Sequence, residues 1–231
     1  MKKLIRNLFL IIIILIIIVG TIVFLNGHKL YKTTLEKQSL EDKIAKIKSD
    51  SSYVTYSDVP EYYINAIIAV EDHRYREHRV LDIIALGRAI ISNIKAKEFN
   101  EGGSTITQQV AKNLFFITED DVVSRKIAEF LVANDLEKKY SKNDVLEFYI
   151  NTIYFGEGYY GIKEAANGYF NKEPKDLTLY EATLLAGVPN APSVYNPKAS
   201  LTLAKKRQEK VVRDMVQYGY LTQAEADNLL K

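Results

Sequence analysis

The chain has 231 residues, a formal net charge of +2 and no cysteine. This charge balance gives no reason to expect a nucleic-acid partner, and the lack of cysteine excludes disulfides and sulfur-based zinc sites. Three histidines are present, His28, His73 and His78. The five-residue spacing of His73 and His78 is not that of a metal-binding pair, so we expect these two to be structural or to support a site from behind the residues that contact substrate.

The first predicted element is an uncharged, apolar helix at residues 8–25. At a rise of about 1.5 Å per residue this stretch is roughly 27 Å long, which matches the hydrocarbon core of a bilayer. A cleaved signal peptide usually ends in small residues, and that pattern is missing here, so we predict a retained, single-pass anchor in the cell membrane. Lys2, Lys3 and Arg6 lie in residues 1–7 and predict a cytoplasmic tail, with the bulk of the chain extracellular.

Residues 26–50 are polar, with apolar residues only at intervals, and are typical of a juxtamembrane helix or stalk. Residues 51–231 show helical periodicity and short connections, without βαβ alternation or hairpin signals, so we predict one all-α domain. The predicted helices begin near residues that favour a helix N-terminus, namely Pro60, Asp82, Thr105, Asp120 or Asp121, Ser141, Thr178 and Thr222.

The segment Gly102–Asn113 combines a glycine hinge with a helix start. Thr105 and Gln108 have capping-box spacing, and Gln108, Gln109 and Lys112 then form a polar stripe on the predicted helix. A mobile loop that brings amides and a lysine to one patch suits an anionic, sugar-bearing substrate. The simpler interpretation is an amphipathic helix with a solvated face.

Two carboxylates occupy unusual positions. Glu71 lies on an apolar helical stripe at a helix C-terminus, where the helix dipole disfavours negative charge, and Glu129 lies on a second apolar stripe. Ordinary ion pairs would explain each one, from Arg125 to Glu129 and from Arg74 or Arg88 to Glu71. Two such carboxylates in one small domain favour a catalytic pair.

Five segments occur in order between residues 51 and 195. They are Glu71–Tyr75 with His78 and Asp82, Gly102–Asn113, Arg125–Glu129 with Leu136–Lys142, Tyr154–Phe170, and Glu181–Ser193. This series resembles the motifs of the peptidoglycan glycosyltransferases, glycosyltransferase family 51. The Gly102–Asn113 string is the most specific of the five.

The chain departs from the family pattern at three places. Val80 stands where the family usually has glycine, and His73 where it usually has arginine. Asp121 lies at about the place of a cation that helps hold substrate phosphate. A Ser-x-x-Lys string at Ser92–Lys95 lacks the other transpeptidase elements, so the chain resembles the monofunctional, membrane-anchored type.

The resemblance implies a lysozyme-like helical glycosyltransferase domain that polymerises a lipid-linked disaccharide pyrophosphate (lipid II) into peptidoglycan strands and releases polyprenyl pyrophosphate. It implies that Glu71 is the general base and that Glu129 supports the leaving-group side, as a ligand of a divalent cation, Mg²⁺ or Mn²⁺. The substrate-binding residues it implies are Asp72, Arg88, Ser104, Thr105, Gln108, Gln109 and Lys112. Its implied partners are the growing glycan strand, the membrane and other cell-wall synthesis proteins.

Two other functions compete with this interpretation. A lysozyme-like enzyme that cleaves peptidoglycan also uses two carboxylates in a helical domain, but it needs no pyrophosphate-binding cation such as Lys112. A membrane-tethered helical scaffold would tolerate replacement of both Glu71 and Glu129.

The stretch Ile83–Ile94 is apolar around most of a helix. Such a helix is either a central core helix or a helix that contacts lipid, with Ile84 and Ile91 on its outer side.

Overall fold

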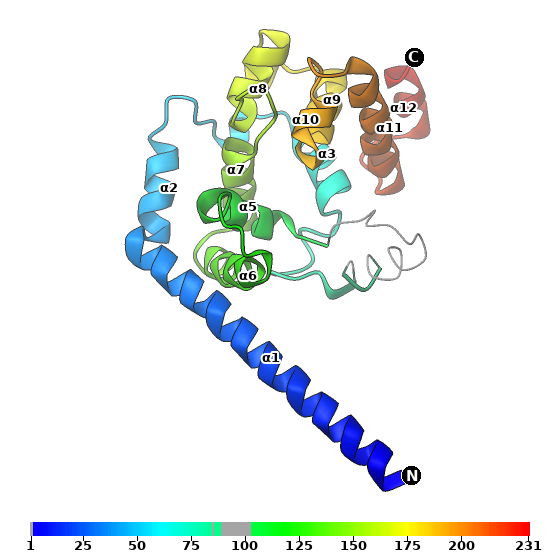
Figure 1. The fold of residues 1–231 in the computed structure, drawn as a ribbon. Helices are drawn as coiled ribbons and strands as arrows, with labels where there is room; N and C mark the ends of the chain where they lie inside the picture. The colour runs from blue at the N-terminus through cyan, green and yellow to red at the C-terminus, as the bar shows by residue number, and fades with distance from the viewer. Residues whose placement is uncertain (1, 85, 89–102) are drawn as a thin grey trace.

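The computed structural model describes residues 2–84, 86–88 and 103–231 (Figure 1). Within them the chain is helical, and the only β-type contact is an isolated antiparallel pair, Tyr154 with Tyr160. The helices are α1 (Lys2–Lys37), α2 (Leu40–Lys48), α3 (Glu61–Glu71), α5 (Ile106–Phe115), α6 (Val122–Lys139), α7 (Lys142–Thr152), α8 (Gly161–Phe170), α9 (Leu179–Gly187), α10 (Pro192–Tyr195), α11 (Leu201–Gln217) and α12 (Gln223–Leu229). Short 3₁₀ turns lie at Tyr56–Asp58, Pro174–Asp176 and Val188–Asn190. The all-α prediction is confirmed.

Most of the predicted helix starts have a side-chain cap, whereas α3 begins after Pro60 without one. Thr105, Ser141, Thr178 and Thr222 each form a complete capping box with the residue three positions later. Asp121 accepts hydrogen bonds from the first free amides of α6. These side chains satisfy N–H groups that have no partner within the helix, so local sequence is sufficient to define where the helices begin.

The helices form two groups around a shared core. Helices α3, α9 and α11 pack on one another, while α5 packs against α6 and α7 (Figure 1). Fully buried side chains from both groups, such as Ile67 of α3, Val110 of α5 and Leu185 of α9, belong to one hydrophobic cluster. Burial of this apolar surface fixes the end of α3 opposite the start of α5.

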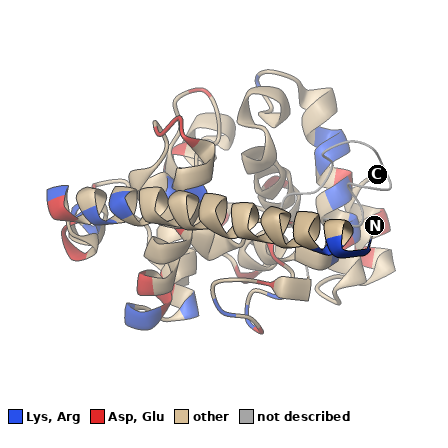
Figure 2. Ribbon diagram, turned by 60° about the horizontal axis from the view of Figure 1, so that its bottom comes forward, with Lys and Arg blue, Asp and Glu red and all other residues tan. Residues whose placement is uncertain are grey.

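Helix α1 leaves the domain and is exposed along its apolar part. Among the described residues it is the one helix long and apolar enough to cross a membrane. Figure 2 shows lysine and arginine at its N-terminal end, followed by uncharged turns. The residues after the apolar part lie against α6, and Leu40 and Ile44 of α2 belong to the core. Residues 26–37 thus continue α1 as a juxtamembrane helix, and together with α2 they pack on the domain that was predicted to begin at residue 51.

The apolar stretch after Asp82 is only partly described. Residues 83, 84 and 86–88 are helical, and Ile83 and Ile84 are 76% and 63% exposed. The interpretation as a central core helix is therefore wrong for these residues. Ile91, the Ser92–Lys95 string and Gly102 lie outside the described residues.

Candidate active site

A cleft of about 820 Å³ opens between the two groups of helices. Most of the substrate-site residues predicted from sequence line it, namely Glu71, Asp72, Arg88, Ser104, Thr105, Gln108, Gln109 and Lys112. Glu129 does not line the cleft. The polar stripe of α5 therefore faces the same space as the end of α3, while Ile106, Val110 and Leu114 on the other side of α5 are buried.

Glu71 stands in the last turn of α3. Its Oε2 accepts a 2.8 Å hydrogen bond from Gln109 Nε2, and its Oε1 is buried with no hydrogen-bond partner among the described residues. Burial raises the pKa of Glu71. The Gln109 hydrogen bond and the charges of Arg207 and Lys210 oppose that rise without cancelling it. A carboxylate of raised pKa with one free oxygen is suited to accept a proton.

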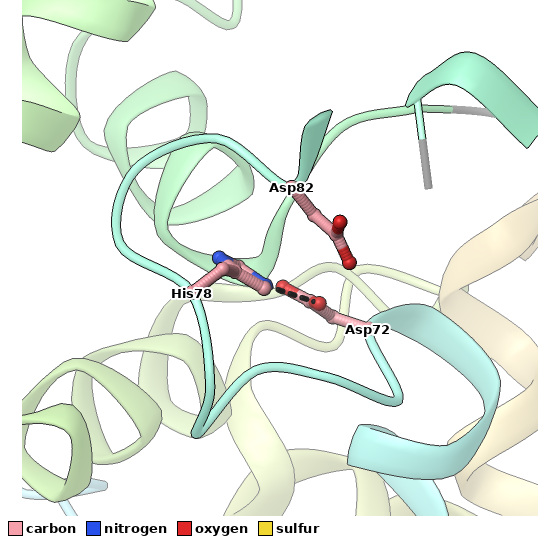
Figure 3. A group of neighbouring side chains, drawn as sticks. All are labelled: Asp72, His78 and Asp82. Carbon is pink, nitrogen blue, oxygen red and sulfur yellow. Dashed lines mark hydrogen bonds and ion pairs between the residues drawn. The ribbon is translucent and has the colours of Figure 1, made fainter. Parts of the chain in front are cut away.

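Asp72 joins the first motif to the second. Its Oδ1 lies 2.6 Å from His78 Nε2, and its Oδ2 accepts a 3.1 Å hydrogen bond from the backbone N–H of Ile106, in the first turn of α5 (Figure 3). A helix N-terminus offers free N–H groups and a partial positive charge, so it stabilises a buried carboxylate by about 0.5–2 kcal/mol. This contact fixes α5 relative to Glu71.

His78 supports Asp72, as predicted for a structural histidine. Burial lowers the pKa of His78, but the hydrogen bond to Asp72 and the charge of Asp72 outweigh burial, so the pKa is raised overall. The other ring nitrogen, Nδ1, contacts the carbonyl oxygen of Arg79. Both ring nitrogens are thus engaged within the protein.

Glu129 is buried behind the cleft wall. Its two oxygens lie 3.2 Å from Arg125 Nε and 2.6 Å from Lys126 Nζ. Lys126 lines the cleft and lies 3.2 Å from the hydroxyl of Ser104. Arg125 is the ion-pair partner expected from sequence, whereas Lys126 was missed, although its i−3 spacing from Glu129 is a detectable signal. Among the residues that the structure describes, Lys126 is the link between Glu129 and the cleft.

A further group of cleft residues comes from the end of the chain. Helix α11 contributes Arg207, Lys210 and Asp214 to the cleft wall, with Lys210 and Asp214 paired at 2.7 Å. Tyr218, just after α11, stacks on His73 with ring centroids 4.3 Å apart. Sequence reasoning missed these residues because their position depends on long-range packing of α11 against α3 and α9.

The positions that depart from the family pattern have structural roles. Asp121 caps α6 by accepting from the N–H groups of Val123 and Ser124 at 3.1 Å. Val80 is buried, and its carbonyl oxygen accepts a 3.1 Å hydrogen bond from Thr105. His73 stacks on Tyr218, as described above.

Two places in the described residues offer carboxylates for a metal ion. Asp72, His78 and Asp82 hold one ligand atom each within 4.8 Å of one another (Figure 3). However, both Asp72 oxygens are already hydrogen-bonded, and Asp82 lies 3.5 Å from Arg74. Glu129 is paired with two cations. Neither place fits a resident metal well, because metal ligands must be free of competing cations and protons.

The comparisons with known proteins identify the family of the chain. A family model described as "Transglycosylase" matches residues 39–216. Penicillin-binding protein 1F of Bacillus subtilis is 43% identical over 186 residues, which cover 80% of this chain and 26% of that protein. Penicillin-binding protein 1A of Aquifex aeolicus is 44% identical over 170 residues, which cover 74% of this chain and 23% of that protein. The chain belongs to the transglycosylase family.

The chain spans about a quarter of the length of these curated relatives. A crystal structure of penicillin-binding protein 1A from Haemophilus influenzae aligns with 78% of this chain and 17% of its own, at 25% identity and a TM-score of 0.47. The family assignment rests on the sequence match, which includes α2 and ends near the C-terminus of α11.

The raised pKa of Glu71 predicts a change in stability. Ionisation of a carboxyl whose pKa is higher in the folded state destabilises the fold, and this loss develops as pH rises from the unfolded to the folded pKa. We expect Glu71→Gln to raise the free energy of unfolding at neutral pH, because the neutral amide avoids the cost of a buried negative charge. The gain should shrink as pH falls toward the ordinary glutamate pKa of about 4.3 and vanish well below it, where the carboxyl is protonated in both states. Denaturant unfolding across this range measures it.

Glu129→Gln is the matched control. Its carboxylate is buried but paired with Arg125 and Lys126, so its neutralisation should lower stability at neutral pH. If Glu71→Gln destabilised the protein as much as Glu129→Gln does, Glu71 would be an ordinary structural carboxylate.

Proposed function

We propose that this chain polymerises a lipid-linked disaccharide pyrophosphate into peptidoglycan glycan and releases polyprenyl pyrophosphate. The observation that carries the proposal is the position of Glu71, a desolvated carboxylate with one free oxygen, in a cleft shared with several cations. Membership of the transglycosylase family supports the same reaction. The monofunctional type stays a prediction, because the relatives are much longer.

Glu71 acts as the general base. Its Oε1 takes the proton of the acceptor sugar hydroxyl while that oxygen forms a bond to the anomeric carbon of the donor. The bond between the anomeric carbon and the pyrophosphate oxygen breaks, and the electron pair leaves with the pyrophosphate. Gln109 holds the other carboxylate oxygen, which keeps the base oriented without neutralising it.

Cations stabilise the charge that develops on the leaving pyrophosphate. Lys112 projects into the cleft from α5, and Lys126 does so from α6 beside Ser104. Charge-assisted hydrogen bonds to phosphate oxygens are strong in a partly desolvated cleft. Glu129 acts on this side through Lys126, whose ammonium it orients.

The same cations disfavour the lysozyme-like alternative. A hydrolase that cleaves finished glycan has no anionic leaving group, so it gains nothing from lysines facing its carboxylate. Lys112 and Lys126 would then only attract anions into the cleft. The scaffold alternative does not explain why Glu71 is a buried carboxylate, since a scaffold would be more stable with an uncharged residue at this position.

A divalent cation remains a proposal from the family resemblance. The carboxylates described above do not form a good resident site, whereas Mg²⁺ commonly binds through substrate phosphates and keeps several waters. If present, the ion would add positive charge at the pyrophosphate.

Association with the membrane would place the protein close to its lipid-linked substrate. We propose that α1 crosses the bilayer once with its N-terminus in the cytoplasm, so that the cleft faces the leaflet that holds the lipid-linked substrate. The exposed side chains of Ile83 and Ile84 would contact that leaflet. Contact with other cell-wall synthesis proteins also remains a prediction.

Replacement of the base tests the reaction directly. We expect Glu71→Gln to lower the rate of glycan polymerisation from lipid-linked disaccharide by about 10²–10⁴-fold, because the acceptor proton then has no carboxylate to receive it. Glu61→Gln, in the exposed first turn of the same helix, is the control and should retain the wild-type rate. A Glu71→Gln enzyme with near-normal polymer yield would refute the assignment.

Replacement of the phosphate-side lysine tests how the substrate binds. Because Lys112 is exposed on the cleft face of α5, Lys112→Ala should lower kcat/KM by about tenfold or more with little effect on thermal stability. Lys206→Ala removes an exposed lysine outside the cleft and should have no effect. Unfolding of Lys112→Ala with unchanged specific activity would make Lys112 structural.

The lipid contact can be measured without the anchor. A chain beginning at residue 26 should bind vesicles of phosphatidylglycerol and phosphatidylethanolamine, and Ile83→Ser/Ile84→Ser should weaken that binding severalfold by removing exposed apolar area. Leu201→Ser/Leu203→Ser replaces a second exposed apolar pair and should leave vesicle binding unchanged. Equal binding by both double variants would refute the proposed contact.

A further inference from the structure

The helix that carries the predicted anchor makes an unusually close contact with the catalytic domain. Gly27 is the buried residue of α1. A Cβ at this position would lie 2.3 Å from Ile127 Cβ and 2.9 Å from the carbonyl oxygen of Ser124, both in α6. Glycine in a helix interior costs about 1 kcal/mol relative to alanine. Here the absence of a side chain is what allows α1 and α6 to approach.

A second contact lies one to two turns further along α1. The hydroxyl of Tyr31 donates a 2.5 Å hydrogen bond to Asp135 Oδ2, near the other end of α6. Leu30 and Leu35 pack against the hydrophobic core between and beyond these points. Contacts at Ile127 and at Asp135 hold α6 at two points along its length, so neither its axial position nor its rotation is free.

The opposite side of α6 serves the cleft. At 100° per residue, Lys126 and Glu129 lie roughly opposite the stripe that contains Ser124 and Asp135. Lys126 reaches the cleft and lies beside Ser104, and Glu129 holds its ammonium at 2.6 Å. A shift of α6 away from α1 therefore moves Lys126 within the cleft.

We propose that Gly27 is a positioning residue for the catalytic cleft, acting through the contact of α1 with α6 on the location of Lys126. The residues after the membrane segment are then a structural part of the site. Because α1 is one continuous helix from Lys2 to Lys37, the helix proposed to cross the bilayer also fixes the position of α6. This inference rests on the proposed function for the identity of the substrate.

The test uses the full chain in detergent, with Gly27→Ala as the main variant and Tyr31→Phe as a milder one that loses only the hydrogen bond to Asp135. Displacement of Lys126 should raise the Kd for inorganic pyrophosphate and the KM for lipid-linked disaccharide, by about tenfold for Gly27→Ala, since misplacement by 1 Å can cost up to 10²-fold. A smaller change in the same direction is expected for Tyr31→Phe.

Gly20→Ala is the control, because a Cβ at Gly20 meets nothing within 4 Å. It should leave both constants unchanged. Lys126→Ala should raise KM in the wild type but add little in the Gly27→Ala background, where Lys126 is already displaced.

A purely structural role for Gly27 gives a different pattern. The fraction of active protein would fall while the Kd and KM of the active fraction stayed at wild-type values, and the Lys126→Ala effect would be additive. That pattern would overturn the inference. Pyrophosphate binding is measured separately from polymer formation, so a wild type that binds pyrophosphate but makes no polymer would refute only the proposed function.

Discussion

The site depends on the position of one buried carboxylate, Asp72. Asp72 follows the last residue of α3, and its oxygens bind His78 and the first backbone N–H of α5. Because the free amides and dipole of a helix N-terminus favour an anion, α5 is held where the chain of α3 ends. Glu71 and Gln109 are thereby brought to 2.8 Å across 38 residues of sequence. This contact adds a specific alignment of Glu71 with the polar stripe of α5 to the packing of the shared core.

The second constraint is the balance of charge around Glu71. Burial opposes its ionisation, while Arg207 and Lys210 favour it from α11. Desolvation of Glu71 is unfavourable, but it leaves the carboxylate without a direct ion pair and with one oxygen that lacks a hydrogen bond among the described residues. Glu129 is the contrasting case, since its two carboxylate oxygens form ion pairs with Arg125 and Lys126. Lys126, one of these two cations, lines the cleft.

Local sequence predicted a large part of the fold. The starts of α5, α6 and α7 follow from Thr105, Asp121 and Ser141, because a cap involves only neighbouring residues. The unusual position of Glu71 on an apolar stripe also marked the site. Long-range packing was harder to predict. Arg207 reaches the cleft because α11 packs against α3, which no local pattern predicts. Residues 26–37 pack on α6 through the close approach at Gly27, and one glycine in the sequence does not identify the helix that it contacts.

The central claim is that Glu71 is a desolvated carboxyl base, and its own titration tests this most directly. Carbon-13 NMR of the glutamate side-chain carboxyls, with Glu71→Gln to assign the signal, gives the pKa of Glu71 in the folded protein. The account predicts a midpoint above the ordinary glutamate value of about 4.3, and a further rise in Gln109→Leu, which loses the hydrogen bond that favours ionisation. A midpoint at or below the ordinary value would contradict the account.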